Sequence, residues 1–145
     1  QMEISIGSDH AGFELKSEIK KYLEQKGHLF HDFGTHGTHS VDYPDFVHPV
    51  AESIANHPHY FGILICGSGN GVAMTANKHR GIRAALCWTP ELAQLSRMHN
   101  DANILCLPAR FLSPTLAMET IVKFLDTPFE GGRHIHRIRK IETDL

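Results

Sequence analysis

Short apolar runs alternate with stretches of helical periodicity along most of the chain. A buried parallel strand is a near-continuous apolar run, whereas a helix repeats its apolar residues every three or four positions. Residues 3–7 therefore predict a strand, and residues 13–26 predict a helix that ends at Gly27. The apolar face of that helix is formed by Leu15, Ile19, Tyr22 and Leu23.

The same alternation continues toward the end of the chain. Further strands are predicted at 28–33, 61–66, 82–87 and 103–107. Further helices are predicted at 47–55, 72–77, 89–98 and 113–124, and a charged helix is predicted after Gly131-Gly132. Five strands that alternate with helices predict an α/β fold, with a parallel sheet and helices on both faces.

Right-handed crossovers place every strand-to-helix loop at one edge of such a sheet, where α/β proteins bind ligands. The segments expected at this edge are Ser8-Asp9-His10, Cys66 to Gly71, Cys87-Trp88 and Pro108-Ala109-Arg110. The sequence therefore predicts that chemistry-bearing side chains from four loops lie near one another.

Length and composition narrow the class of protein. A chain of 145 residues suits one domain, 1–145, with a C-terminal helix from about 131. A net charge of −2 gives no case for nucleic acid or a membrane as partner. Three cysteines are few and fit a reducing compartment. The sequence shows no signal peptide and no apolar run near the ~20 residues of a membrane span, so we expect a cytoplasmic protein.

The histidine content raises the question of a metal. Twelve histidines are many, and His57-Pro58-His59 and His134-Ile135-His136 are the obvious pairs. Neither pair is joined by cysteines or carboxylates at ligand spacing, so solvated or structural histidines are the better interpretation. We expect neither a metal nor a cofactor.

The loop Cys66-Gly67-Ser68-Gly69-Asn70-Gly71 is the strongest candidate for chemistry. Its glycines let the backbone turn sharply and leave N–H groups free to point at an anion. A thiol beside an anion site tends to have a lowered pKa, which suits a nucleophile or a base. The alternative is a core cysteine before a tight turn, and the spacing alone leaves both open.

Three known phosphate-binding or phosphatase motifs fail at a required residue. A dinucleotide fingerprint counted from Gly67 needs glycine at Val72, and a P-loop counted from Gly7 needs lysine at Phe13. A cysteine phosphatase would need arginine where Val72 stands. What remains is a loop of amides suited to an oxyanion or a small phosphate.

Taken one at a time, the other candidate site residues are weaker indications of function. Asp9-His10 can steer a proton or hold a hydroxyl, although Asp9 also suits a helix N-cap. His99 can exchange protons near neutral pH, although the end of a helix is also an ordinary place for a histidine. Arg133 and Arg137 share one helix face and suit a phosphate, although a solvated basic face is the simpler interpretation.

Together, five motifs resemble the type B ribose-5-phosphate isomerase family, which also includes galactose-6-phosphate isomerase subunits. The motifs are Gly7-Ser8-Asp9-His10-Ala11-Gly12, Asp42-Tyr43-Pro44-Asp45, the Cys66 to Gly71 loop, His99-Asn100-Asp101-Ala102-Asn103, and Gly132-Arg133-His134 with Arg137. Each is weak alone, but all five in this order are highly specific. Ser68 stands where the family often has threonine, Asn70 stands at a variable position, and Cys66 marks the subgroup whose base is a thiol.

The resemblance implies a Rossmann-like three-layer sandwich and a homodimer, with a tetramer left open, whose sites are shared across the subunit interface. It also implies that no metal is used. The implied reaction interconverts ribose 5-phosphate and ribulose 5-phosphate through an enediolate.

The resemblance also implies a role for each site residue. Cys66 moves a proton between C2 and C1, and the loop amides stabilise the oxyanion. His99 opens the sugar ring with Ser68 or Asp9 nearby. The substrate-binding residues are Asp9, His10, Tyr43, Gly67, Ser68, Gly69, Asn70, Gly71, Asn100, Arg110, Arg133 and Arg137. Among these, Tyr43 and Asn100 hold hydroxyls, while the phosphate is held by His10, Arg110, Arg133 and Arg137.

Two alternatives stay open at this point. The substrate can be a six-carbon phosphosugar such as allose or galactose 6-phosphate, because the segment around Val41 and Tyr43 can set substrate length. The chain can also be a non-catalytic phosphosugar-binding module. The presence of both Cys66 and His99 argues against that second alternative, because binding alone needs neither residue.

Overall fold

The computed structural model describes residues 1–143, so the last two residues of the expected domain 1–145 lie outside the described residues. The strands are β1 (Glu3–Ser8), β2 (Leu29–Asp32), β3 (Phe61–Cys66), β4 (Ala84–Leu86) and β5 (Ile104–Pro108). The helices are α1 (Phe13–Gln25), α2 (Pro44–Asn56), α3 (Asn70–Ala76), α4 (Pro90–Asn100), α5 (Pro114–Asp126) and α6 (His134–Arg139), with a 3-10 turn at His10–Gly12.

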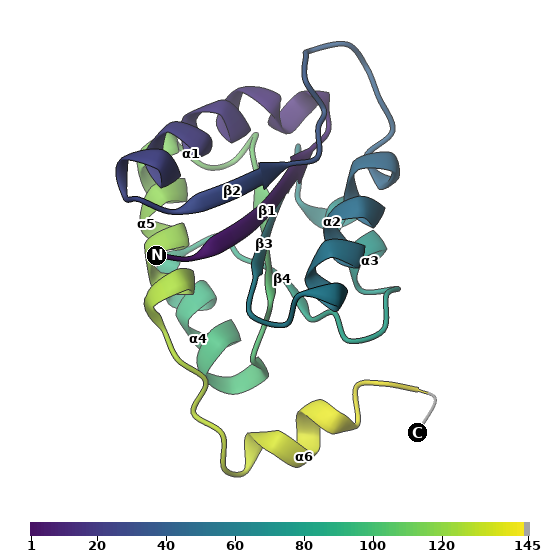
Figure 1. The fold of residues 1–145 in the computed structure, drawn as a ribbon, viewed down its shortest axis with the longest axis vertical. Helices are drawn as coiled ribbons and strands as arrows, with labels where there is room; N and C mark the ends of the chain where they lie inside the picture. Colours follow the sequence, from purple (N-terminus) through teal and green to yellow (C-terminus); the bar gives the residue numbers. More distant parts are fainter. Residues whose placement is uncertain (144–145) are drawn as a thin grey trace.

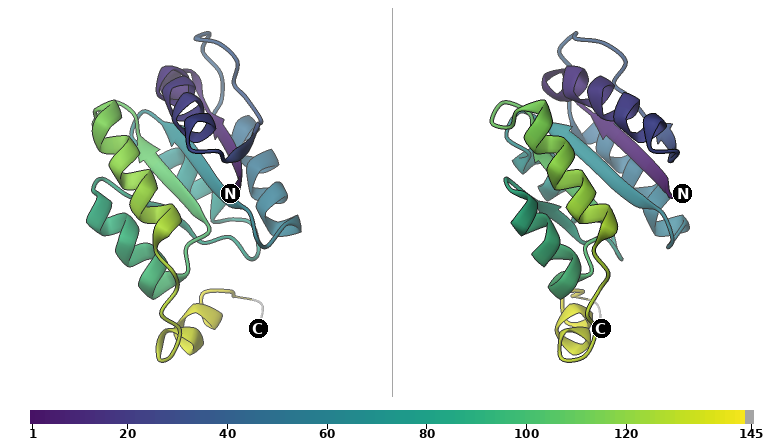
Figure 2. Two further views of the ribbon diagram at one scale, coloured as in Figure 1. Left: turned by 60° about the vertical axis from the view of Figure 1, so that its left-hand side comes forward. Right: turned by 90° about the vertical axis from the view of Figure 1, so that its left-hand side faces the viewer.

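The five strands form one sheet in the order β2-β1-β3-β5-β4. Every neighbouring pair is parallel, and β3 and β5 run in register, with Ile65 opposite Leu107 and Cys66 opposite Pro108. Helices cover both faces of this sheet (Figures 1 and 2). The predicted three-layer α/β sandwich is thus confirmed.

Alternate residues of the central strands face opposite sides, as strand geometry requires. Ile63 and Ile65 join the apolar cluster that contains residues of α1, α4 and α5. Leu64 and Cys66 join the cluster that contains residues of α2 and α3. Because β3 is buried on both faces, its sequence is continuously apolar, and the side chain of Cys66 lies on the α2 and α3 side.

Two elements differ clearly from the sequence-based prediction. β4 covers only Ala84–Leu86 rather than 82–87, because the N–H of Arg83 donates to the Asn103 side chain at 2.8 Å instead of a strand neighbour. α2 begins at Pro44, three residues before the predicted start, with proline in the first turn where its missing N–H costs nothing. In α1, the charged residue Lys16 is fully buried.

The parallel sheet has two chemically distinct edges. Its carboxyl edge carries the loops that leave the strands, including the long segment between β2 and α2. Its amino edge carries the end of α4, and α6 lies beyond this edge, at the far end of the molecule from that long segment (Figure 1). Within residues 1–143, the structure contains no helix that is both long and apolar enough to cross a membrane.

Candidate active site

A pocket of about 510 Å³ opens at the carboxyl edge, where the ends of β1, β3 and β5 meet. Its lining comes from four separate loops and combines a thiol, a carboxylate, an imidazole, a guanidinium and a phenol. The lining residues are Asp9, His10, Ala11, Tyr43, Cys66, Gly67, Ser68, Gly71, Arg110 and Phe111. Three of the four loop segments predicted at this edge therefore line one pocket. The fourth, Cys87-Trp88, does not line it, although the Trp88 ring stacks on Phe111 with centroids 4.9 Å apart.

Cys66 differs from the other two cysteines in its surroundings. All three thiols are free and buried, but only Cys66 lines the pocket, where it is 5% exposed. Burial raises the pKa of Cys87 to about 11 and raises the pKa of Cys106 well above its usual value. Those two thiols are therefore held protonated, whereas Cys66 faces a polar pocket.

Two glycines of the loop allow side chains to approach its backbone closely. A Cβ at Gly67 would lie 3.1 Å from the guanidinium carbon of Arg110, and a Cβ at Gly71 would lie 2.5 Å from the Tyr43 ring. Arg110 and Tyr43 are thus packed directly against the loop that follows Cys66. The N–H of Asn70 donates to the Ser68 hydroxyl oxygen at 3.2 Å, which fixes that side chain within the turn.

Asp9 and His10 are held in place by backbone groups. A carboxylate oxygen of the buried Asp9 accepts the N–H of Gly12 at 3.1 Å, so the N-cap role that was one of the alternatives is observed. Nδ1 of His10 accepts the N–H of Val41 at 3.1 Å. In a neutral imidazole this assigns the proton to Nε2, which makes that atom a hydrogen-bond donor.

A buried ionic cluster anchors the segment that leads to Tyr43. Nζ of Lys16 donates to Asp32 Oδ1 at 2.6 Å and also to the carbonyl of Thr35. Asp32 accepts two further hydrogen bonds, from Lys20 at 2.7 Å and from the N–H of Gly34 at 2.9 Å. Burial by itself would raise the pKa of Asp32, but these donors outweigh it and lower the pKa. Burial lowers the pKa of Lys16, and Asp32 opposes that shift.

Four of the predicted site residues lie elsewhere. His99 and Asn100 end α4, Arg133 precedes α6, and Arg137 lies on α6. α4 starts after Thr89 at the carboxyl edge, and ten residues of helix carry the chain about 15 Å toward the amino edge. Within one chain, His99 is therefore separated from Cys66 by the depth of the sheet.

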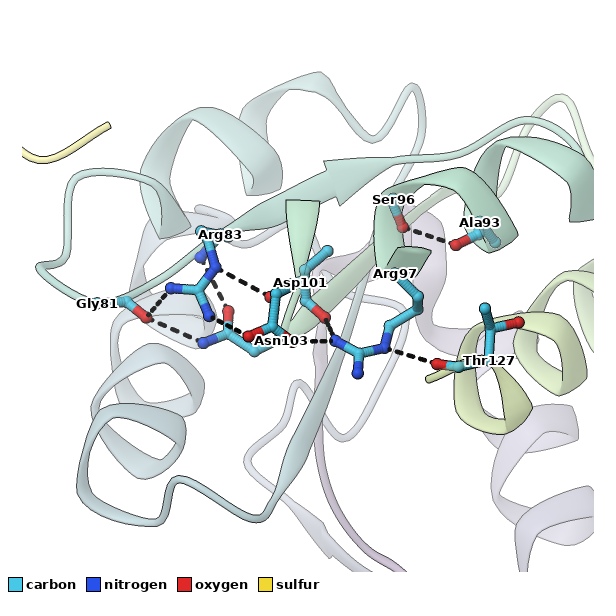
Figure 3. A network of polar contacts seen from close by, with 9 residues as sticks. Gly81, Arg83, Ala93, Ser96, Arg97, Asp101, Asn103 and Thr127 are labelled. Atoms are coloured by element: carbon cyan, nitrogen blue, oxygen red, sulfur yellow. Dashed lines mark hydrogen bonds and ion pairs between the residues drawn. The ribbon is translucent and has the colours of Figure 1, made fainter. Parts of the chain in front are cut away.

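A polar network fixes the end of α4 at the amino edge (Figure 3). The guanidinium of Arg97 donates to Asp101 Oδ1 at 2.9 Å, to the carbonyl of Ala102 at 2.6 Å and to the carbonyl of Thr127 at 3.2 Å. Arg83 also donates to the carbonyl of Asp101, at 2.9 Å. The last turn of α4, which carries His99, is thereby tied both to the segment that precedes β5 and to the end of α5.

His99 has two close neighbours from the segment that leads into α6. Its ring stacks on the His134 ring with centroids 4.6 Å apart and planes at 19°. Nε2 of His99 lies 3.8 Å from Glu130 Oε2, and Nε2 of His134 lies 3.9 Å from Glu130 Oε1. The N–H of Glu130 donates to the carbonyl of Met98 at 3.1 Å, which joins this segment to α4.

The structure thus divides the predicted site into two groups. Eight predicted residues line the pocket, and Gly69 and Asn70 lie in the same loop. His99, Asn100, Arg133 and Arg137 form a second group at the amino edge. The sequence analysis missed Phe111 and Glu130. Phe111 directly follows the predicted loop segment that ends at Arg110, so extending that segment by one residue would have found it. Glu130 had a signal too, because it lies four residues before His134 and supplies the carboxylate that the metal argument took to be absent.

The sequence matches the Ribose/Galactose Isomerase family over residues 4–141. It is 42% identical over 139 residues to ribose-5-phosphate isomerase B of Escherichia coli K12, across 96% of this chain and 93% of that protein. A ribose 5-phosphate isomerase of Thermotoga maritima has a TM-score of 0.95 and 52% identity over 97% of both chains. Ribose-5-phosphate isomerase B of Mycoplasma genitalium, solved with bound ribulose 5-phosphate, has a TM-score of 0.93 and 43% identity over 97% of this chain and 94% of that one.

Proposed function

Because the chain belongs to the ribose/galactose isomerase family and is an isomerase, we propose that it interconverts ribose 5-phosphate and ribulose 5-phosphate through an enediolate. The relatives support this substrate, since ribulose 5-phosphate is bound in the structure of the Mycoplasma genitalium protein. The observation that carries the proposal is the carboxyl-edge pocket, which combines the Cys66 thiol with donors suited to a phosphorylated polyol.

The chemical step needs one base that reaches both C1 and C2. In the aldose direction, the Cys66 thiolate removes the proton from C2, the electron pair forms the C1–C2 double bond, and the C1 carbonyl oxygen becomes the enediolate oxyanion. The hydroxyl proton on O2 is then transferred to O1, the carbonyl forms at C2, and the thiol returns its proton to C1. The amides of Gly67 to Gly71 stabilise the oxyanion that develops, a contribution of roughly 2.7–4 kcal/mol per donor in comparable sites.

Ring opening must precede this step, because ribose 5-phosphate is mostly a closed ring in water. We assign it to the imidazole of His99, which can take the anomeric proton and deliver a proton to the ring oxygen. Ser68 and Asp9 assist from the pocket side. Asn100 and Tyr43 hold substrate hydroxyls.

The phosphate is assigned to hydrogen-bond donors from both edges. His10 presents an Nε2 donor and Arg110 lies against the loop after Cys66, both in the pocket. Arg133 and Arg137 come from the amino edge and provide guanidinium forks that suit a phosphate. We expect no metal in this reaction, since the proton transfers are assigned to side chains.

The separation of the two groups requires a second copy of the chain. His99 cannot approach Cys66 of its own chain, because α4 carries it to the opposite edge of the sheet. In a two-fold dimer, the amino edge of one chain meets the carboxyl edge of the other, and this occurs twice by symmetry. We therefore propose a homodimer in which each site takes Cys66 from one subunit and His99 from the other.

Complementation between two inactive variants tests this arrangement. The Cys66→Ala chain retains His99, and the His99→Asn chain retains Cys66. A mixed dimer then has one site with both groups and one site with neither. Random assortment makes half the dimers mixed, so the mixture should regain about one quarter of the activity of the unmutated protein.

The matched control mixes Cys66→Ala with the double variant Cys66→Ala/His99→Asn, which leaves every dimer without Cys66. A mixture that shows only the average activity of its two parent variants would reject shared sites.

Initial rates with ribose 5-phosphate, allose 6-phosphate and galactose 6-phosphate on the unmutated protein identify the substrate. Faster turnover of either six-carbon substrate would reject the five-carbon assignment.

A further inference from the structure

We propose that His99, Glu130 and His134, the His–Glu–His cluster, form a binding site for a divalent transition-metal ion such as Zn²⁺, and that the bound ion inhibits the isomerase. Metal binding by the cluster does not depend on the proposed function. Only the inhibition rests on it, through the role assigned to His99.

The geometry brings three ligand atoms together from two segments of the chain. One ring nitrogen of His99, one ring nitrogen of His134 and one carboxylate oxygen of Glu130 lie within 4.8 Å of one another. Two imidazoles and one carboxylate are a donor set that Zn²⁺ accepts, with the fourth position left to water or a substrate oxygen. The cluster thus has the composition of an open tetrahedral site.

One of these atoms is buried without a partner. Nε2 of His134 has no hydrogen-bond partner among the described residues, and the residue is only 6% exposed. A buried polar atom in this state ordinarily has a bound water or ion beside it. Nε2 lies 3.9 Å from a Glu130 oxygen, a gap too wide for a hydrogen bond, so this nitrogen lies near the carboxylate without being paired to it.

The charges around the cluster act in opposite directions on a cation. Arg133 and Arg137 lie close enough to act on His134 and repel a cation, so they weaken the affinity. The negative charge of Glu130 opposes that repulsion.

The ligands must move closer to bind an ion. Zinc–ligand distances of about 2.0–2.2 Å in a tetrahedron put ligand atoms roughly 3.3 Å apart. The observed separations of 3.8 and 3.9 Å to Glu130 are longer than this. The side chains of His99 and Glu130 are 39% and 42% exposed, so both can turn toward His134, which is fixed by its burial.

The consequence for catalysis follows from the atom that the ion occupies. A metal bound to Nε2 of His99 takes the lone pair that would accept the anomeric proton. Ring opening then stops, while proton transfer at Cys66 is untouched. We therefore expect Zn²⁺ to inhibit the reaction from the closed aldose more than the reaction from the open-chain ketose.

Direct binding is the primary test. Zn²⁺ is titrated calorimetrically into the metal-free full-length protein, and Co²⁺ is used as an optical probe of coordination. We expect Glu130→Gln, an exposed and isosteric change, to weaken Zn²⁺ binding by more than about tenfold, since even outer-shell partners of metal ligands contribute that much. His134→Gln should do the same, with thermal unfolding as the check on its fold.

Two control variants remove the competing ligands. His48 and His79 form another imidazole pair, with Nδ1 and Nε2 2.6 Å apart, so His48→Gln tests that pair. Cys66→Ser tests the thiol, which is itself a strong zinc ligand. Both controls should keep the Zn²⁺ affinity of the unmutated protein.

The outcomes separate this proposal from the proposed function. Binding that survives Glu130→Gln and is lost in either control would overturn the metal site. Equal inhibition of the two reaction directions would overturn its effect through His99. Failure of Cys66→Ala and His99→Asn to complement would reject the shared active site and leave the calorimetric result unaffected.

Discussion

The two edges of the sheet are built in different ways. At the carboxyl edge, Cys66 and its neighbours form a pocket from buried strand ends, with Arg110 and Tyr43 packed against glycines. At the amino edge, His99 is more than one-third exposed, and Arg133 and Arg137 are exposed around a short helix. The carboxyl edge carries an open pocket to which several loops contribute, whereas the catalytic candidates of the amino edge lie on an exposed surface.

This difference follows from the topology of the sheet. A parallel sheet places the ends of all its strands at one edge, which concentrates polar loops there. A helix that returns across the sheet delivers its own last turn to the opposite edge. Cys66, the proposed base, and His99, the proposed ring-opening group, thus lie at opposite edges of the sheet in one chain, and the proposed dimer would bring them together.

The largest effect is expected from Cys66→Ala. This change removes the proposed base at the carboxyl edge, so turnover should fall by about 10³–10⁴-fold while the substrate affinity stays nearly constant. Steady-state kinetics with release of isotope from C2 measures both. Cys106→Ala is the matched control, since Cys106 is buried on the same face of the sheet but outside the pocket. Near-normal turnover of Cys66→Ala would remove the thiol from the mechanism.

The next effect concerns the buried anchor of the carboxyl edge. Asp32→Asn leaves the fully buried Lys16 without its charged partner, which should reduce the free energy of unfolding by ~3–5 kcal/mol. Denaturant unfolding measures the loss. The double variant Asp32→Asn/Lys16→Met should recover part of it, because the unpaired charge is then gone.

The contribution of Asp32 to the free energy of unfolding should decrease as the pH falls. The folded-state pKa of Asp32 lies below its ordinary value of 3.8. Its stabilising contribution is therefore complete above about pH 3.8 and is lost as the pH falls through the lower, folded-state pKa. Asp32→Asn should show a weaker loss of stability on acidification than the unmutated protein. Parallel acid-unfolding curves for the two proteins would contradict this.

A smaller effect on activity, unequal in the two directions of the reaction, is expected from a change at the amino edge. His99→Asn should slow the aldose-to-ketose direction by about 10²-fold, the lower end of what a positioned acid–base group contributes. The reverse direction should lose less, because ribulose 5-phosphate cannot form that furanose and enters as an open chain. Initial rates in both directions, with thermal unfolding as the control for folding, make the comparison. Equal losses in a folded variant would leave His99 as a binding or structural residue.

The fold was predictable because its signals are local. β3 and β5 are nearly continuous apolar runs, and the side chains of Thr89 and Ser113 cap their helices by accepting the N–H groups of Leu92 and Leu116. The bounds of β4 were missed, because the Asn103 side chain that replaces a strand partner at Arg83 is distant in sequence.

The composition of the pocket was predictable for the same topological reason, since parallel strands bring their following loops to one edge. The burial of Lys16 was not, because it depends on Asp32, a partner 16 residues away that the helical pattern does not reveal. The position of His99 relative to Cys66 was also beyond a local pattern. It follows from the length and direction of α4. The sequence alone does not show which subunit contributes His99 to a given site.

The smallest effect is expected from Arg137→Ala, which tests whether the exposed amino edge contributes binding alone. Loss of one charge-assisted contact to the phosphate should cost about 1.5–3 kcal/mol of binding free energy. KM should rise by the corresponding factor, while kcat stays almost unchanged. Arg139→Ala is the matched control, because Arg139 lies two residues along the same exposed helix. Kinetics with ribose 5-phosphate and with unphosphorylated ribose distinguish the causes. The phosphorylated substrate should lose affinity in Arg137→Ala and keep it in Arg139→Ala, whereas ribose should respond to neither. If ribose and ribose 5-phosphate lose equally, Arg137 does not contact the phosphate, and the amino edge then contributes through His99 and Asn100 instead.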